Sequence, residues 1–312
     1  MTSSLTLTPG NYQRILLIVD PTLRRTPAFE RAAWLARASG ASLHMVLFDR
    51  NRVIAAAEKL DHSESKMARE SWIGEKIARL KEETMLLARD GVSATSEVVW
   101  TRSLLEEILI HVQEYQPDLV IKDTTHENLI KRVLLTPLDW HLLRDCPVPL
   151  LLVNSLAHAL PKRIVAAVDI QPTSAAVEVL NDQIIHAALS LALQSDAELH
   201  LAHCFEVAAA IPMDPMGTGV EMAAELYATL EAIAIDNFAA ICDRYGVAAE
   251  RRHFLPGAPG LALAEFARGD NSDVIVIGAE HHTAMDRAML GTSGESILQN
   301  APCNVLAVKR AT

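Results

Sequence analysis

The chain repeats itself, and this repeat constrains the fold more than any other feature of the sequence. Residues 118–154 align with residues 273–309 without a gap, at a constant offset of 155. Identical residues at paired positions are Asp118 and Asp273, Arg132 and Arg287, Leu135 and Leu290, and Pro147 and Pro302. Upstream, two further pairs of segments match in the same order: 12–20 with 161–169, and, with a small insertion, 35–48 with 191–205. Ordered matches along a whole half indicate two versions of one domain.

Each half alternates short apolar runs with helical patterns. In the second half the apolar runs are 163–168, 198–205, 251–255, 273–277 and 303–308. The helical patterns between them are 174–195, 220–245, 261–267 and 292–299, and the first half has its own long helix near 63–89. Such runs are typical of parallel strands covered on both faces, and right-handed crossovers then give a doubly wound sheet. We predict two tandem five-stranded α/β domains with strand order 3-2-1-4-5, over 11–154 and 162–311, joined by a linker at 155–161.

The charge balance excludes some partners. Lysine and arginine total 28 against 39 aspartates and glutamates, a net charge of −11. An anionic chain repels nucleic-acid phosphates and anionic lipid heads, so we expect neither nucleic acid nor membrane as a partner.

The sequence also indicates where the protein acts. We find no basic segment followed by a long apolar one at the start, and no apolar stretch long enough to cross a bilayer. Cys146, Cys204, Cys242 and Cys303 show no CxxC spacing and are expected to be buried thiols in a reducing compartment. We therefore expect a cytoplasmic protein.

A ligand site is expected where the strand order reverses, outside the carboxyl ends of the strands. In the second half the facing loops there are 167–171 and 278–295. Gly291, followed by Thr292 and Ser293, opens the last helix, and backbone N–H groups at such a start form an anion site. Asp169 can hold a metal ion against phosphate oxygens.

These residues resemble the universal stress protein family, whose loop of the form G-x2-G-x9-G-[ST] cradles ATP phosphates. Here the loop reads Gly278-Ala-Glu-His281, nine residues, then Gly291-Thr292. The segment Gly257-Ala-Pro-Gly also looks like the family, and Trp100 and the run 136–144 are similar to its tandem members. The resemblance covers residues 11–311.

The resemblance implies a Rossmann-like sheet of the adenine-nucleotide α-hydrolase type, with ATP and Mg²⁺ in the second half. The residues implied to bind the nucleotide are Ala167, Val168, Asp169, Ile277, Gly278, His281, Gly291, Thr292 and Ser293. It also implies that the last strands, 150–153 and 305–308, pair within one chain as an internal pseudo-dimer. Self-association into a homo-oligomer stays open.

One position departs from the family pattern, because His281 replaces the inner glycine. If that position needs a positive φ, histidine costs about 1–2 kcal/mol more than glycine. The side chain would either crowd the phosphates or, when protonated, attract them.

The first half departs further. Asp123 stands where the second half has Gly278, and Thr136-Pro137 replaces Gly291-Thr292, which removes an N–H from the helix start. Asp139 suits the helix dipole itself, and Trp140 adds bulk. Losing two or three charge-assisted hydrogen bonds, at about 1.5–3 kcal/mol each, removes most useful affinity. We expect no equivalent nucleotide site in this half.

The histidines are the main candidates for a functional site other than the nucleotide site. His126, His141 and Cys146 share one segment, and His281 and His282 are adjacent. No HExxH or CxxC spacing supports zinc, so we do not expect a zinc site. His200 and His203 lie three apart in a strand, so they face opposite sides and serve packing. Without a G-x-S-x-G elbow we predict no nucleophilic site.

Three functions remain to be weighed. The first is a stress-response protein that binds ATP or a related nucleotide, with at most slow hydrolysis because no dedicated general base stands beside the phosphate site. The second is a scaffold whose crevices bind an apolar metabolite or a partner, with residues 207–220 as a loop that could fold over such a ligand. The third is an enzyme of the adenine-nucleotide α-hydrolase group, which is disfavoured because residues 169–174 lack an SGGxDS-like loop.

Overall fold

The structure is a computed structural model that describes residues 12–49, 54, 62–124, 136–154, 160–170, 175–206, 218–279 and 292–309. The first half contributes the strands β1 (Arg14–Ile18), β2 (Ser42–Asp49), β3 (Ala94–Trp100), β4 (Leu119–Asp123) and β5 (Leu150–Val153). The second half contributes β6 (Arg163–Ala167), β7 (Glu198–Phe205), β8 (Arg252–Pro256), β9 (Val274–Ala279) and β10 (Asn304–Lys309).

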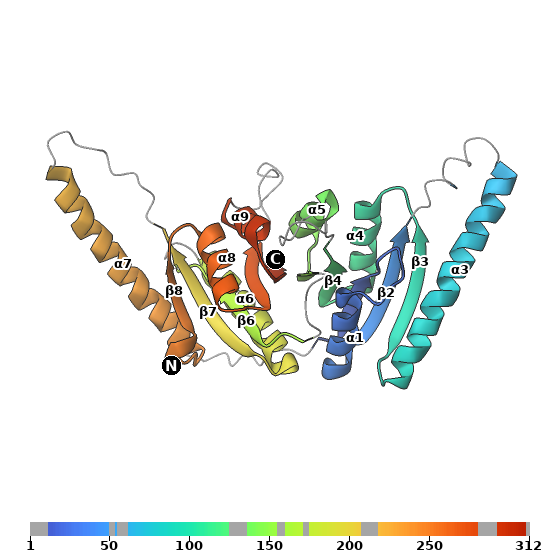
Figure 1. The fold of residues 1–312 in the computed structure, drawn as a ribbon, viewed down its shortest axis with the longest axis horizontal. Helices are drawn as coiled ribbons and strands as arrows, with labels where there is room; N and C mark the ends of the chain where they lie inside the picture. Colours follow the sequence, from blue (N-terminus) through green and yellow to red (C-terminus); the bar gives the residue numbers. More distant parts are fainter. Residues whose placement is uncertain are drawn as a thin grey trace.

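Helices alternate with these strands along the chain (Figure 1). Those of the first half are α1 (Pro27–Ser39), α3 (His62–Arg89), α4 (Leu104–Tyr115) and α5 (Pro137–Asp145). Those of the second half are α6 (Ala175–Ser195), α7 (Thr218–Arg244), α8 (Pro259–Gly269) and α9 (Thr292–Asn300), with a short 3₁₀ turn at Ala249–Arg251. None of the described helices has both the length and the apolar character needed to span a membrane.

All ten strands form one sheet in the order β3-β2-β1-β4-β5-β10-β9-β6-β7-β8. Within each half the neighbouring strands are parallel, and the order is the predicted 3-2-1-4-5. The halves join where β5 and β10 pair antiparallel, with Leu151 opposite Leu306. This is the strand pairing that the family resemblance implied. Just beyond it, the backbone N–H of Asn154 donates to Oδ1 of Asn304 at 2.8 Å.

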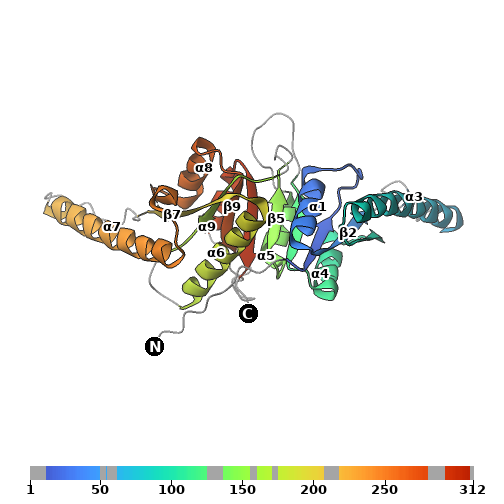
Figure 2. The same cartoon turned by 90° about the horizontal axis from the view of Figure 1, so that it is seen from below.

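Two apolar layers cover the sheet, and each runs through both halves. One layer contains buried residues of α1, α3, α6 and α7, and the other contains those of α4, α5, α8 and α9. Figure 2 shows α1 and α6 flanking the centre of the sheet, where they contact each other. Burial of β4 and β5 residues such as Ile121 and Leu151, both 0% exposed, explains why the strands read as apolar runs rather than as alternating patterns.

The repeat preserves backbone anchors as well as strand order. Oδ2 of Asp118 accepts hydrogen bonds from the backbone N–H groups of Gln13 and Arg14, at 2.6 and 2.8 Å. Its partner in the alignment, Asp273, does the same for Lys162 and Arg163, at 2.7 and 3.0 Å. In both halves a carboxylate before the fourth strand therefore fixes the start of the first strand.

The buried histidines serve packing, and His200 and His203 lie on opposite faces as predicted. Nδ1 of His203 contacts the backbone oxygen of Val168 at 3.0 Å, and its ring packs against Phe238 of α7. On the other face Nδ1 of His200 lies 2.8 Å from Nε2 of His253, with the two rings stacked. Burial lowers the pKa values of His200, His203 and His253.

One glycine is required for helix packing in the second half. A Cβ added at Gly260 in α8 would lie 1.8 Å from Oγ and 2.3 Å from Cβ of Ser296 in α9. At Gly74 in α3, an added Cβ meets nothing within 4 Å.

We therefore expect Gly260→Ala to lower the free energy of unfolding by about 1–3 kcal/mol, because an overpacked core strains its neighbours. The matched variant Gly74→Ala should raise it by about 0.5–1 kcal/mol, since alanine favours an unobstructed helix interior. Urea denaturation measures both values. Equal effects of the two substitutions would show that α8 and α9 do not approach this closely.

The histidines also predict a pH dependence of stability. A histidine whose pKa is lowered by folding takes up its proton more readily in the unfolded chain, whose histidine pKa is about 6.5. The stabilisation is complete above that value and is lost as the pH falls below it. The urea midpoint should therefore decrease between about pH 7.5 and about pH 5.5, and less steeply in His203→Gln. A His203→Gln variant with an unchanged slope would mean that His203 is not buried as a neutral ring.

Candidate functional site: the ends of the central strands

In each half the first and fourth strands are neighbours, and their carboxyl ends are where a ligand site is expected. In the first half β1 and β4 pair side by side, and in the second half β6 and β9 do. The helix after the first strand and the helix after the fourth strand cover opposite faces of the sheet, as their two core layers show. The strand order therefore reverses at these two places, which is where ligands of doubly wound sheets bind.

In the first half, the chain's own carboxylates occupy this place. Asp123, the last residue of β4, accepts a hydrogen bond from the backbone N–H of Ala28 at 3.0 Å and one from Oγ1 of Thr26 at 2.5 Å. These donors belong to the start of α1, so an internal anion satisfies the positive end of that helix. Burial raises the pKa of Asp123, and its hydrogen bonds oppose that rise.

A second carboxylate occupies the start of α5. Oδ2 of Asp139 accepts from the backbone N–H of Thr136 at 2.7 Å, and Oγ1 of Thr136 accepts from the N–H of Asp139, which together make a capping box. Asp139 is fully buried, and its Oδ1 lies 2.8 Å from Nζ of Lys122. Nζ of Lys122 also donates to the backbone oxygen of Asp123 at 2.8 Å. We call Lys122, Asp123 and Asp139 the β4 charge network.

The second half has no charge at any of the three corresponding positions. At the offset of 155 they are Ile277, Gly278 and Gly294. Ile277 is buried in β9, and α9 begins at Thr292, so Gly294 lies in its first turn. The N-terminus of α9 is therefore not capped by a carboxylate at the position where Asp139 caps α5.

Gly278 has a packing role that the sequence did not reveal. A Cβ at Gly278 would lie 2.7 Å from Cδ2 of Leu180 and 3.0 Å from Cδ1 of Ile184, both in α6. In the first half the side chain of Asp123 extends from this position toward α1. In the second half α6, the equivalent helix, packs directly against Gly278. Glycine is needed here for helix–sheet packing, whether or not a ligand binds.

The remaining candidates lie at the end of β6 and the start of α9. Ala167 ends β6, and the register of Ala166 with Val276 brings this end beside Ile277. Val168 is buried and its N–H donates to the backbone oxygen of Ala202 at 2.9 Å. Thr292 and Ser293 form the first residues of α9, whereas His281 and Gly291 lie outside the described residues.

Asn181 was missed by the sequence analysis. Its Oδ1 accepts from the backbone N–H of Asp169 at 3.0 Å, and its Nδ2 donates to the backbone oxygen of Asp169. Asn181 is 4% exposed, while the side chain of Asp169 is exposed. The amide thus fixes the backbone at Asp169 from both its N–H and its carbonyl side. A polar residue inside the apolar helical pattern of 174–195 was the available signal.

Other reactive side chains do not converge. Within the described ranges, no three His, Cys, Asp or Glu side chains are grouped so as to hold a metal ion. Cys146 and Cys242 are buried free thiols as predicted, but Cys204 and Cys303 are only half-buried because they lie at strand ends. Burial raises the pKa of Cys204 to about 11 and that of Cys303 to about 12, which keeps both as thiols. His126 and His282 lie outside the described residues.

Two doubly wound halves in one sheet, joined through their fifth strands, define a tandem α/β protein of the Rossmann-like class. The family model described as "Universal stress protein family" matches residues 11–154 and again residues 161–309. The chain therefore belongs to the universal stress protein family.

Relatives of tandem type agree with this assignment over nearly the whole chain. Universal stress protein E of Escherichia coli strain K12 is 25% identical over 304 residues, which is 96% of this chain and 94% of that protein. A functionally unknown protein, PA1789 of Pseudomonas aeruginosa PAO1, has a solved structure with a TM-score of 0.76 and 25% identity, covering 96% of this chain and 93% of that one. A putative universal stress protein of P. aeruginosa UCBPP-PA14 gives a TM-score of 0.75 at the same identity and coverage.

The β4 charge network should be strongly coupled. Removing one partner of a buried ion pair leaves the other charge uncompensated, so Asp139→Asn should lower the free energy of unfolding by about 3–5 kcal/mol. The double variant Lys122→Met with Asp139→Asn should lose less than the sum of the two single variants. Urea denaturation of the four proteins completes the cycle. Additive losses would show that Lys122 and Asp139 do not interact.

Proposed function

We propose that this protein is a stress protein that binds ATP or a related nucleotide, with Mg²⁺, in its second half. The site lies outside the ends of β6 and β9. The observation that carries this proposal is that the second half lacks the β4 charge network. Its three corresponding positions hold Ile277, Gly278 and Gly294, which have no charge. The start of α9 thereby keeps its positive end available for a phosphate.

The end of β6 also supports this proposal. Asn181 holds the backbone of Asp169, so the exposed carboxylate sits on a fixed segment beside the switch point. Oxygen ligands of this kind suit Mg²⁺, which commonly binds through one carboxylate and the phosphates of a nucleotide. We assign Asp169 to the metal that accompanies the nucleotide, and Ala167 and Val168 to the backbone beside it.

Binding rather than rapid turnover fits the described residues. His203 lies on β7, the strand next to β6, but its Nδ1 contacts the backbone oxygen of Val168 and its ring is buried. It cannot act as a general base on a water in the crevice. We therefore propose slow hydrolysis at most, a role in stress tolerance as in the family, and action in the cytoplasm, where the four free thiols remain reduced.

A scaffold function is the second candidate, and one surface favours it. Leu226, Leu230 and Ile233 of α7 are 59%, 41% and 50% exposed and share one helix face. Figure 1 shows α7 at the edge of the molecule, beyond β8. Exposed apolar stripes of this kind serve partner proteins.

Calorimetric titration with ATP and Mg²⁺ separates the two candidates. The wild type should release or absorb heat on binding, and Gly294→Asp should weaken the affinity at least about tenfold, because it restores the carboxylate that caps α5 in the first half. Gly74→Asp adds the same charge on exposed α3 and should leave the affinity unchanged. Folding of Gly294→Asp is checked by its melting temperature, which should not fall, since aspartate suits a first helical turn.

Two results would contradict the nucleotide proposal. A wild type that gives no heat favours the scaffold. Equal affinities of the wild type and Gly294→Asp would place any bound nucleotide away from α9.

A further inference from the structure

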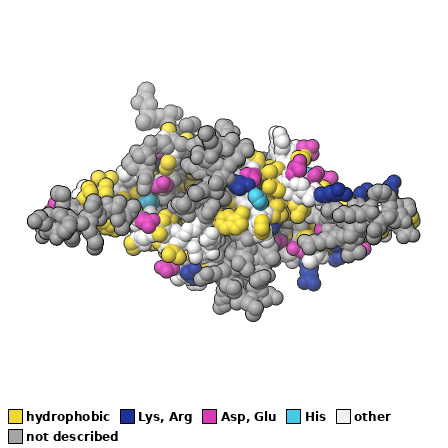
Figure 3. Space-filling model, turned by 90° about the horizontal axis from the view of Figure 1, so that it is seen from above, with side chains coloured by type: hydrophobic (Ala, Val, Ile, Leu, Met, Phe, Trp, Pro, Cys, Tyr) yellow, Lys and Arg dark blue, Asp and Glu magenta, His cyan; other side chains and the backbone are white. Residues whose placement is uncertain are grey.

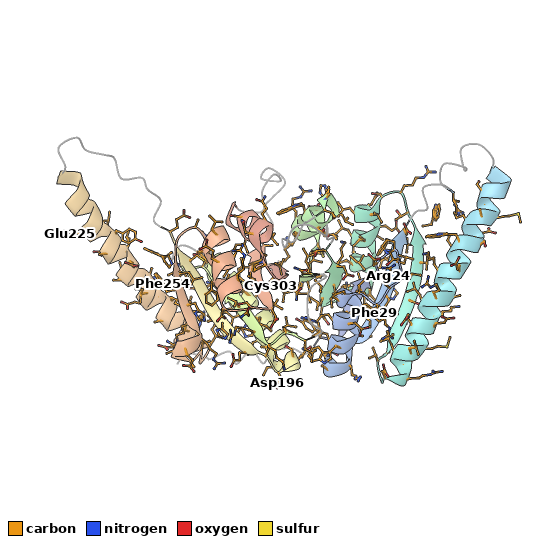
Figure 4. The ribbon with its side chains drawn as sticks, in the orientation of Figure 1. Arg24, Phe29, Asp196, Glu225, Phe254 and Cys303 are labelled. Atoms are coloured by element: carbon orange, nitrogen blue, oxygen red, sulfur yellow. The ribbon has the colours of Figure 1, made fainter. Side chains whose placement is uncertain are left out.

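A cavity of about 110 Å³ lies in the first half between the β1–α1 connection and α3. Its apolar floor is formed by Val19, Phe29 and Leu80, which are 5%, 4% and 2% exposed. Three arginines, Arg24, Arg25 and Arg79, line the same cavity. Figure 4 labels Arg24 and Phe29, and Figure 3 shows Lys and Arg side chains grouped toward α3 on the face of the strand ends.

Arg25 is held in place by its neighbours. Its Nε donates to Oε2 of Glu83 at 3.0 Å, and its Nη2 lies 2.9 Å from the same oxygen. The guanidinium also lies 5.1 Å from the centre of the Phe29 ring. Arg25 and Glu83 therefore neutralise each other and form a fixed wall of the cavity.

Arg24 and Arg79 are different, because neither has an ion pair or hydrogen bond with any residue in the described part of the chain. Both are exposed at the mouth of the cavity. Glu82 is the one other carboxylate of the lining, so the lining carries three positive and two negative charges in a chain of net charge −11. The local balance is opposite to that of the whole protein.

The loop that carries Arg24 has a strained and well-anchored backbone. Leu23 has a φ of 55°, in the left-handed region that side chains other than glycine and asparagine rarely adopt. Its N–H donates to the backbone oxygen of Asp20 at 2.9 Å, and Nζ of Lys76 in α3 donates to the backbone oxygen of Pro21 at 3.2 Å. Residues in such conformations cluster at binding sites, where the surrounding structure holds them.

The second half shows that the fold does not need these charges. Gly91 and Gly246, at the ends of the two long helices, both have positive φ and differ by the offset of 155. The same offset places Ala234 at the position of Arg79 and Phe238 at the position of Glu83. Ala234 and Phe238 are buried in the apolar layer under α7. The charged cavity is therefore particular to the first half.

We propose that this cavity binds a small organic anion with a compact apolar body. Its carboxylate or phosphate group lies between Arg24 and Arg79, and its apolar body lies against Phe29 and Leu80. Guanidinium groups suit both acid groups through paired N–H donors. The volume of about 110 Å³ suits a body of about one ring, and a cavity of about 150 Å³ holds benzene. The site is separate from the nucleotide site proposed at β6 and β9.

Phenyl phosphate is a suitable probe, with binding followed by ligand-observed NMR and by calorimetry on the full chain. We expect it to bind, and more weakly as salt is raised. Benzyl alcohol, which has the ring without the charge, and inorganic phosphate, which has the charge without the ring, should each bind at least about tenfold more weakly.

Substitutions then locate the probe. Arg24→Gln and Arg79→Gln should each reduce the affinity for phenyl phosphate about tenfold or more. Both side chains are exposed, so neither variant should unfold. Arg89→Gln is the matched control, because Arg89 is an exposed arginine in the last turn of the same helix, about 15 Å from Arg79.

Three outcomes would overturn the proposal. The first is that phenyl phosphate does not bind the wild type. The second is that it binds Arg24→Gln and Arg79→Gln as tightly as Arg89→Gln. The third is that Gly294→Asp abolishes binding while both arginine variants retain it, which would place the probe at α9 in the second half. That last result would leave the nucleotide proposal standing, so the two proposals fail separately.

Discussion

The antiparallel pairing of β5 with β10 is the contact on which the rest of the structure depends. Each half alone would end in an exposed strand edge formed by an apolar run, which is a template for aggregation. Pairing Leu150, Leu151 and Leu152 with Ala307, Leu306 and Val305 covers both edges at once. It also makes the two apolar layers continuous, because α1 meets α6 on one face of the joined sheet. The buried Lys309 of β10 adds to this joint, since its Nζ donates to the backbone oxygens of Leu143 and Arg144 at the end of α5. The duplication thus yields one folded body.

The two halves of this joined sheet differ in the charges that lie near the start of the helix after the fourth strand. A helix that starts beside the end of the fourth strand presents unpaired N–H groups there. In the first half Asp139 caps α5, and Asp123 accepts a hydrogen bond from the start of α1. Lys122 forms an ion pair with the buried Asp139. The second half carries Ile277, Gly278 and Gly294 at these positions, so no carboxylate caps α9 where Asp139 caps α5. A buried ion pair contributes little net stability against an apolar alternative, so the charges of the first half are better explained as a closed site than as a source of stability.

The sequence predicted the strand order and the approximate bounds of the second half's strands and helices, because buried parallel strands must be short apolar runs and their connections must be helices. It also predicted that His200 and His203 face opposite sides, since side chains alternate along a strand. It did not reveal contacts that join distant segments. The hydrogen bond from the backbone N–H of Ala28 to Asp123 spans 95 residues, and Gly278 packs against Leu180, which is far from it in the sequence. Asn181 stands out in the sequence as a polar residue in an apolar helical pattern, but its partner is the backbone of Asp169, which the sequence does not identify.

The long helices show that divergence is not confined to the fourth strand. In the second half α7 places Ala234 and Phe238 against the sheet and turns Leu226, Leu230 and Ile233 to solvent. In the first half the positions of Ala234 and Phe238 hold Arg79 and Glu83, and a cavity opens beside them. A charge that replaces a buried apolar side chain costs desolvation unless it is paired or kept in water. Glu83 is paired with Arg25, and Arg79 stays at the cavity mouth, so the exchange is tolerated without a new buried charge. The first half therefore has the β4 charge network at its switch point and a positively lined opening beside α3, whereas the second half has uncharged residues at both sets of positions.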